Sequence, residues 1–341
     1  MIEPAGQIAE KLHNYLNAQT EQGRFSGSVL VARQGDIILK QGYGWANVEL
    51  GVPNTPLTKF RIASIGKPFT AMAVLQLHEQ GLLHVQDPLI RYVPEYPNAD
   101  RITIHQLLTH TSGIPNFSTL PDWEEFKMKR STPGRMIQRF RSMPLDFAPG
   151  QGFKYSNSAY VLLAYLVEQV SQQTFGDFIR QRILAPLQMN DTGEDNPRTI
   201  ITNRASGYEL EQGELVNSQF IDMSIGIGSG GLYSTVEDLY RFDRGLYTEK
   251  LVSQSTLELI HTGYVRSAAH NAEYGYGWFI AREDWGGTSR LRIGHSGSIY
   301  GFKSQLNRYV EDGLAVIVLS NLASSPKDQI VLDLTRIAYG G

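Results

Sequence analysis

The stretch RIASIGKPFTAMAVLQLHEQG, residues 61–81, places a serine and a lysine at the start of a helix without a polar face. The residues from Phe69 to Leu77 are almost all apolar, so the helix is predicted to be buried. Ser64 and Lys67 stand three residues apart and therefore share one helix face, where the lysine amine can approach the serine hydroxyl. Pro68 fits this first turn, in which its missing N–H would have had no partner.

This pair of residues suits nucleophilic catalysis. Burial disfavours the charged amine and lowers its pKa, so a buried Lys67 can accept the proton of Ser64 at physiological pH. The start of a helix also favours developing negative charge, because its first N–H groups are unpaired. The alternative is structural: Ser64 caps the helix and Lys67 extends to solvent. Serine and lysine at this spacing are common, so the catalytic interpretation requires partners elsewhere.

A second polar group opens another apolar helix, within FAPGQGFKYSNSAYVLLAYLVEQV, residues 147–170. Tyr155 and Asn157 follow a Gly/Pro turn there and are candidates for the same site. The alternative makes Tyr155 a core residue and Asn157 or Ser158 a helix cap.

A third group lies in RIGHSGSIYGF, residues 292–302, within the strand-rich end of the chain. His295, Ser296 and Gly297 are predicted to line the edge of a cleft, with the glycine allowing the backbone to approach a ligand.

The chain of 341 residues is predicted to form an α+β fold. Residues 26–46 carry a hairpin signal, and residues 274–321 contain four successive strand patterns followed by a helix. We therefore expect one antiparallel sheet built from both ends of the chain. The predicted division is a sheet domain of residues 1–85 and 225–341 with an all-helical domain, residues 86–224, inserted into it.

The composition excludes several classes of function. A formal net charge of −3 gives no broad positive field, so neither nucleic acid nor an anionic membrane is an expected partner. The absence of cysteine removes disulfides, thiol nucleophiles and thiolate metal sites. The apolar runs are far shorter than the ~20 residues of a membrane-spanning helix. The first residues lack a signal-peptide core, so the protein is expected to be cytoplasmic, or periplasmic or secreted after removal of a signal.

No metal site is expected, because the eight histidines show no recognised ligand spacing. His105 and His110 are predicted to satisfy local backbone groups near a helix end. The segment GIGSGG, residues 226–231, is interpreted as a tight loop at the cleft, since no convincing strand precedes it.

Together the three motifs resemble those of the serine β-lactamase and penicillin-binding protein superfamily, specifically its class C-like branch, which also holds esterases, D-aminopeptidases and DD-carboxypeptidases. The family motifs Ser-x-x-Lys, Tyr-x-Asn and Lys-Thr-Gly or a variant correspond to Ser64 and Lys67, Tyr155 and Asn157, and residues 295–297. The flanking segments LLTHTSGIP and GSGGLYSTVEDLYRF extend the resemblance over most of the chain. It implies a β-lactamase/transpeptidase-like fold, with a cleft between sheet and helices into which all three motifs point.

The resemblance also implies a mechanism without a cofactor. Ser64 would be the nucleophile, Lys67 and Tyr155 would share the proton transfers, and Asn157 would hydrogen-bond Lys67 and the substrate amide. The backbone N–H groups of Ser64 and Ser298 would form the oxyanion hole. We find no counterpart of the deacylating glutamate of class A β-lactamases, so Tyr155 is the expected base for deacylation.

The main departure from the family pattern is His295, where many members have lysine. Near its reference pKa of about 6.5 a histidine is mostly neutral at pH 7.5 and offers a substrate carboxylate less charge than lysine does. We therefore expect a preference for substrates recognised without a free carboxylate. Arg290 and Arg292 are predicted to lie on the opposite face of the strand from His295. Arg282 and Lys303 are weaker candidates for carboxylate binding.

The sequence thus predicts a serine hydrolase that acts through an acyl-enzyme on a small ester, amide or D-amino-acid-containing peptide. One alternative is a class C-like β-lactamase. The other is a penicillin-binding receptor or inactive scaffold, acylated without turnover. Turnover distinguishes the receptor from the two enzymes.

Overall fold

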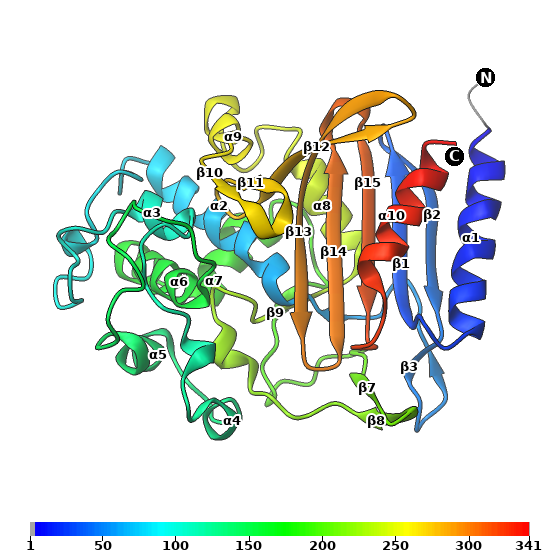
Figure 1. Cartoon of the computed structure of the whole chain (residues 1–341), viewed down its shortest axis with the longest axis horizontal. Helices are drawn as coiled ribbons and strands as arrows, with labels where there is room; N and C mark the ends of the chain where they lie inside the picture. Colours follow the sequence, from blue (N-terminus) through cyan, green and yellow to red (C-terminus); the bar gives the residue numbers. More distant parts are fainter. Residues whose placement is uncertain (1–3, 341) are drawn as a thin grey trace.

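The computed structural model describes residues 4–340 and contains an antiparallel sheet of eight strands with helices on both faces (Figure 1). The strand order is β10-β11-β12-β13-β14-β15-β1-β2. The strands are β1 Gly27–Arg33, β2 Asp36–Tyr43, β10 Val265–Ser267, β11 Ala272–Tyr274, β12 Phe279–Trp285, β13 Thr288–Ile299, β14 Phe302–Tyr309 and β15 Leu314–Ser320. The predicted α+β fold with an antiparallel sheet is confirmed.

The sheet joins the two ends of the chain. β1 pairs with β15, with Val29 opposite Val318, so the blue and orange-red strands of Figure 1 lie side by side. The hairpin of β1 and β2 lies where the sequence predicts it. The same holds for the four strands β12 to β15 and for the helix that follows them, α10 (Lys327–Ala338). The short edge strand β10 and its neighbour β11 were not predicted.

Alternating residues of the central strands build two cores, one on each face of the sheet. On one face Val29, Val316 and Val318 pack with α10 and with α1 (Ala5–Glu21), whose Ile8 and Leu12 are buried. On the other face Leu30 and Ile317 join the larger core around α2 (Gly66–Glu79) and α8 (Val236–Gly245). Period-two alternation is what a sheet covered on both faces requires.

The remaining helices lie mostly between α2 and α8 in the chain. They are α3 Ile104–Leu108, α4 Trp123–Phe126, α5 Pro133–Phe140, α6 Asn157–Ser171, α7 Phe175–Ile179 and, after α8, α9 Gln254–Ile260. Seven further short strands lie within residues 4–340: β3 Trp45–Asn47, β4 Val52–Pro53, β5 Phe60–Arg61, β6 Gly193–Glu194, β7 Tyr208–Glu211, β8 Glu214–Asn217 and β9 Leu232–Ser234.

Residues 86–224 are therefore not entirely helical, because β6, β7 and β8 fall within them. The β7–β8 hairpin forms because Gln212 and Gly213 both adopt positive φ, as a tight two-residue turn requires. The division into two domains stays a prediction. Residues 1–3 and 341 of the predicted sheet domain lie outside the described residues.

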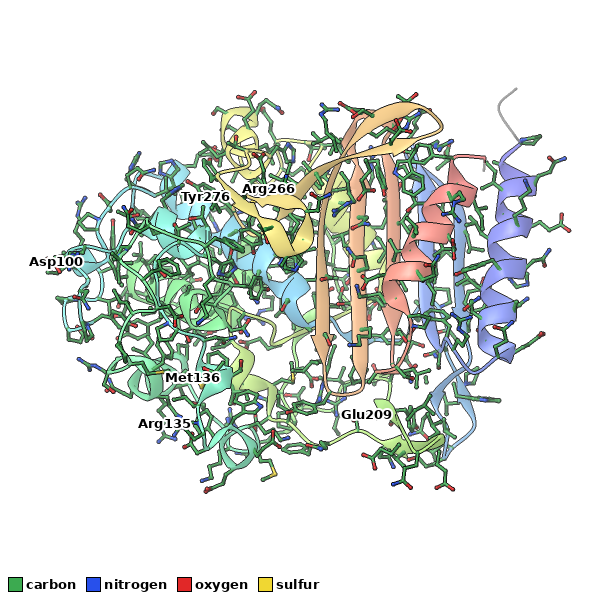
Figure 2. The ribbon with its side chains drawn as sticks, viewed as in Figure 1. Asp100, Arg135, Met136, Glu209, Arg266 and Tyr276 are labelled. Atoms are coloured by element: carbon green, nitrogen blue, oxygen red, sulfur yellow. The ribbon has the colours of Figure 1, made fainter. Side chains whose placement is uncertain are left out.

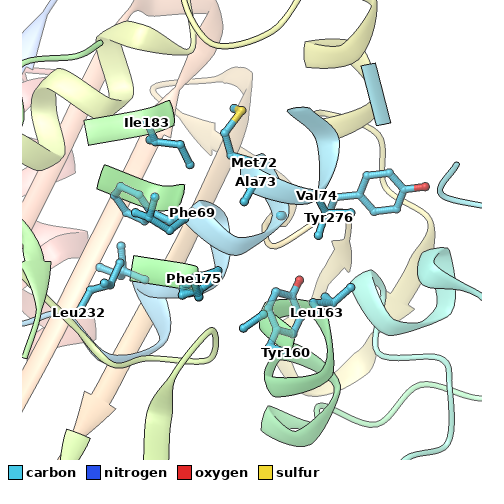
Figure 3. Close-up of a cluster of buried hydrophobic side chains, with 14 of the residues drawn as sticks. Phe69, Met72, Ala73, Val74, Tyr160, Leu163, Phe175, Ile183, Leu232 and Tyr276 are labelled. Carbon is cyan, nitrogen blue, oxygen red and sulfur yellow. The ribbon is translucent and has the colours of Figure 1, made fainter. Parts of the chain in front are cut away.

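The helix α2 is buried on all sides. Every residue from Gly66 to Leu77 is buried, and Phe69 stacks on Phe242 of α8 with ring centroids 4.1 Å apart. Figure 3 shows side chains of α2 and α6 packed in one cluster. Charged side chains such as Asp100, Arg135 and Arg266 are exposed at the outside of the molecule (Figure 2). Within residues 4–340, no helix combines the length and apolarity that crossing a membrane demands.

One ion pair is fully buried between the sheet and α8. The Arg308 Nε donates to Asp243 Oδ1 at 2.8 Å, and the two residues are 0% and 1% exposed. The guanidinium also donates to the His261 Nε2 at 3.1 Å. Burial, and then the Arg308 charge, lower the pKa of His261 to about 4, so this imidazole remains a neutral acceptor.

We expect Asp243→Ala to reduce the free energy of unfolding by about 3 to 5 kcal/mol, because it leaves the Arg308 charge buried without its partner. Urea denaturation measures the change. The matched control is Arg336→Ala, which breaks an exposed pair with Asp333 and should cost about 1 kcal/mol or less. Equal losses in the two variants would contradict the expectation.

Candidate active site

Ser64 lies in a single 3₁₀ turn, Ala63–Ile65, directly before α2. Ala63 has a φ of +46°, which is uncommon for a residue with a side chain. The turn is held by close packing against the loop of residues 226–231, since a Cβ on Gly230 would lie 3.0 Å from the Ala63 carbonyl carbon. The chain thus presents Ser64 partly exposed in front of a buried helix.

Lys67 is 0% exposed and surrounded by oxygen atoms. Its Nζ lies 2.8 Å from Asn157 Oδ1, 2.8 Å from the Ser229 carbonyl oxygen and 3.2 Å from Ser64 Oγ. Burial holds the pKa of Lys67 well below its ordinary value. The predicted approach of Lys67 to Ser64 is present in the structure.

These neighbours determine what a neutral Lys67 can do. A neutral amine has two N–H donors and one lone pair, and the oxygens of Asn157 and Ser229 can only accept. Both N–H groups are therefore used on these two oxygens. The lone pair is left for the one neighbour that can donate, the Ser64 hydroxyl, which is the arrangement that proton abstraction from Ser64 requires.

Tyr155 lies just before α6, and Asn157 is the first residue of that helix. Ser156 is the N-cap, with its hydroxyl accepting from the Ala159 N–H at 3.4 Å, so Asn157 is free to contact Lys67. The Tyr155 ring centroid lies 4.7 Å from Lys67 Nζ. Burial raises the pKa of Tyr155, and a hydrogen bond with Ser64 acts in the opposite direction. Tyr155 is thus a protonated phenol beside the Ser64 hydroxyl.

The third motif lies on the free part of β13. β12 pairs with β13 only up to Gly294, so among the strands of residues 4–340 only β14 pairs with residues 295–299. A Cβ on Gly297 would lie 2.3 Å from the Ile62 carbonyl oxygen, which explains the glycine: β13 packs directly on the turn that carries Ser64. Ser298 lines the same pocket as Ser64, whereas His295 and Ser296 line a different cavity together with Arg292.

His295 is 2% exposed rather than open to solvent. Burial, and secondarily the Lys67 charge, lower its pKa to about 3, so the expectation of a value near the reference pKa is wrong. Arg290 and Arg292 pair with Asp312 and Glu283, away from the Ser64 pocket. Lys303 instead donates to Ser298 Oγ at 2.8 Å.

The pocket in front of Ser64 is largely apolar. No charged side chain of the described residues lines it. Its apolar walls come from the loop after α3, the start of α4, the segment before β9 and the end of β13: Phe117, Trp123, Ile221, Met223, Ile225 and Ile299. The pocket therefore suits an uncharged group next to the reacting carbonyl.

Sequence reasoning missed two groups. The first is the Ser229 carbonyl, from the loop that was predicted to lie at the cleft. The second is His110, whose contacts are not local: its Nδ1 accepts from the Ser156 N–H at 3.1 Å and its Nε2 lies 3.2 Å from the Tyr274 hydroxyl. His105 likewise contacts the distant Tyr276 hydroxyl at 2.8 Å. In the described part of the chain, no three His, Asp or Glu side chains converge in a way that would hold a metal ion.

The fold and this arrangement of serine, lysine and tyrosine define a protein of the serine β-lactamase and transpeptidase class. The profile of the Beta-lactamase family matches residues 8–339, and the chain belongs to this family. Penicillin-binding protein 4* of Bacillus subtilis is 31% identical over 315 residues, which cover 88% of this chain and 69% of that protein.

Solved structures of related proteins show the same fold. An octameric penicillin-binding protein homologue from Pyrococcus abyssi superposes with a TM-score of 0.87 at 30% identity, over 97% of this chain and 77% of the other. D-amino acid amidase from Ochrobactrum anthropi, solved with L-phenylalanine, gives a TM-score of 0.83 at 25% identity, over 97% and 98% of the two chains. Relatives of these kinds place the chain in a family of serine hydrolases.

We expect the pH dependence of Ser64 acylation to reflect the lowered pKa of Lys67. A base must be unprotonated, so the acylation rate should rise with pH and level off well below the ordinary lysine pKa of about 10.4. Lys67→Arg, which stays charged, should slow acylation by about a hundredfold or more. Burst kinetics with p-nitrophenyl acetate measure both effects. Lys40→Arg, in a surface pair with Glu237, is the control. A rate that still rises steeply at about pH 10 would exclude this role for Lys67.

Proposed function

We propose that this protein hydrolyses a small amide, ester or D-amino-acid-containing peptide through an acyl-enzyme on Ser64. The observation that carries the proposal is the environment of the Lys67 Nζ, where two acceptor oxygens leave the lone pair of the neutral amine for the Ser64 hydroxyl. In the proposed roles Ser64 is the nucleophile, Lys67 the base of acylation and Tyr155 the acid for the leaving group.

The proposed reaction runs in two halves. Ser64 Oγ attacks the substrate carbonyl carbon and its proton passes to Lys67. As the tetrahedral intermediate collapses, Tyr155 gives its hydroxyl proton to the leaving group and regains a proton from Lys67. Water then attacks the acyl ester, one of its protons passes to the Lys67 and Tyr155 pair, and a proton returns to Ser64 Oγ. The acid is released and both groups are neutral again.

Backbone N–H groups of Ser64 and Ser298 are the proposed donors to the oxyanion. Support comes from the free edge of β13, which lies against the Ser64 turn and has no β12 partner beyond Gly294. Asn157, through its side-chain amide, is proposed to orient the substrate as well as Lys67.

The apolar pocket supports substrates with an apolar group on the acyl side. The neutral His295 supports substrates recognised without a free carboxylate, because it carries no charge to pair with one. The likeness to a D-amino acid amidase solved with L-phenylalanine supports the same class. We therefore propose amides or esters of apolar amino acids ahead of β-lactams.

A penicillin-reactive protein is the second candidate, as either a class C-like β-lactamase or a receptor that is acylated without turnover. The support for it is the likeness to penicillin-binding protein 4*, together with an accessible Ser64 beside a neutral Lys67. The reactive residues would be the same, so only the rate of deacylation separates this candidate from the first.

We expect repeated turnover of D-phenylalanine amide by the wild-type protein and none by Ser64→Ala. Intact mass after brief exposure to benzylpenicillin, with hydrolysed product followed in the same samples, tests the second candidate. A lasting adduct with no product from either compound indicates a receptor, and rapid penicillin hydrolysis indicates a β-lactamase. Reaction that persists in Ser64→Ala would overturn the proposed nucleophile.

Tyr155→Phe should affect poor leaving groups most. An amide nitrogen leaves only when protonated, so removal of the phenol should slow acylation by an amide by about a hundredfold or more. p-Nitrophenolate leaves without a proton, so acylation by p-nitrophenyl acetate should change much less. The ratio of the two pre-steady-state rates is the measurement. Equal losses for both substrates would assign Tyr155 a purely structural role.

A further inference from the structure

We propose that His110 and Tyr274 are positioning residues that join the backbone on both sides of Tyr155 to His295 in one hydrogen-bonded unit across the cleft. The unit runs from the start of α6, through His110 and the Tyr274 hydroxyl at the end of β11, to His295 on the free part of β13. In its kinetic consequences this inference rests on the proposed function, whereas its hydrogen-bond pattern can be tested independently.

His110 holds the backbone on both sides of Tyr155. The Lys154 N–H donates to the His110 carbonyl oxygen at 3.1 Å, and the Ser156 N–H donates to His110 Nδ1 at 3.1 Å. The imidazole also lies against the Tyr155 ring, with centroids 4.3 Å apart. The phenol proposed as the acid is thus fixed by one residue through three contacts.

These contacts determine the tautomer of His110. Because Nδ1 accepts from a backbone N–H, the proton of the neutral ring is on Nε2. Nε2 therefore donates to the Tyr274 hydroxyl at 3.2 Å. Burial, and the nearby Lys67 and His295, lower the pKa of His110 well below its usual value, so the ring stays neutral.

His295 has the opposite tautomer. Its Nδ1 lies 2.7 Å from the Ser296 carbonyl oxygen, which can only accept, so Nδ1 carries the proton. Nε2 is then an acceptor, 3.4 Å from the Tyr274 hydroxyl. Since Tyr274 receives a hydrogen bond from His110, its own proton is available for His295, with the Tyr160 hydroxyl, which donates to the Leu108 carbonyl oxygen, as the other acceptor nearby. The chain runs in one direction, and all three side chains keep their neutral forms.

The backbone of His110 supports a positioning role. Its φ is +59°, an uncommon value for a residue with a side chain, and the residue is 1% exposed. Tyr274 is 0% exposed. An uncommon backbone conformation together with buried, mutually satisfied polar groups gives a rigid arrangement. Its effect is to hold the Tyr155 phenol and the β13 edge at one separation around Ser64 and Lys67.

The kinetic test removes one hydroxyl from the chain. Tyr274→Phe should lower kcat for D-phenylalanine amide by about ten- to a hundredfold, because the amide leaving group needs the Tyr155 proton and a misplaced reacting group costs rate steeply, with KM changed by less than about threefold. The matched control is Tyr276→Phe, which removes a tyrosine–histidine hydrogen bond on the same segment, but one to His105 rather than to His110 and His295. If both variants lose kcat equally, the positioning role is wrong.

A second variant tests whether the residues act as one unit. His110→Asn can still accept from the Ser156 N–H, and asparagine tolerates positive φ, but it cannot reach Tyr274 as Nε2 does. The double variant His110→Asn/Tyr274→Phe should therefore be no slower than the slower single variant. Losses that multiply would show independent roles and contradict the unit.

The hydrogen-bond pattern is read directly from ¹⁵N spectra of the histidine rings in the unliganded wild type, assigned with the His110→Asn and His295→Asn variants. We expect His110 as the Nε2–H tautomer and His295 as the Nδ1–H tautomer, both neutral at about pH 6. The reverse tautomer at either ring, or a charged ring, would overturn the inference. A wild type that turns over neither D-phenylalanine amide nor p-nitrophenyl acetate would refute the proposed function, and the tautomers would still decide for or against the hydrogen-bonded unit.

Discussion

The site depends on the exclusion of water from the Lys67 amine. A buried amine is costly unless its donors are paired, and the two carbonyl-type oxygens that pair them come from distant parts of the chain. Asn157 belongs to α6 and Ser229 to the loop before β9. α2, α6 and this loop must therefore meet at one point. Gly228 permits the approach, since a Cβ there would lie 2.4 Å from the Tyr160 carbonyl oxygen.

The sheet meets the same constraint from the other side. β13 must lie against the turn that carries Ser64, which the missing side chain of Gly297 allows, and it must extend beyond β12 to leave an edge without a strand partner. An unpaired edge is a liability for a protein unless something occupies it. Here the unpaired edge of β13 forms a wall of the pocket, and this edge is the one proposed to bind substrate.

Local patterns made much of the fold and site predictable. Helix geometry alone brings Lys67 to Ser64, and period-two alternation identified the strands that became β12 to β15. The Ser229 carbonyl could not be found in this way, because every residue has a carbonyl. The contacts of His110 span 46 and 164 residues, distances over which no periodicity carries information. The β7–β8 hairpin was missed although its Gln-Gly turn was visible, because its strands are only four residues long.

The environment of His295 changes the interpretation of the third motif. A lysine at this position would bring a second amine close to the buried Lys67, and the two charges would compete for the same limited solvation. A neutral imidazole avoids that cost, and its Nδ1 proton is taken by the Ser296 carbonyl. His295 therefore attracts a substrate carboxylate less than a lysine would, but its neutral ring can be oriented by the surrounding tyrosines. The pocket in front of Ser64, which no charged side chain of the described residues lines, is consistent with a substrate that carries no charge there.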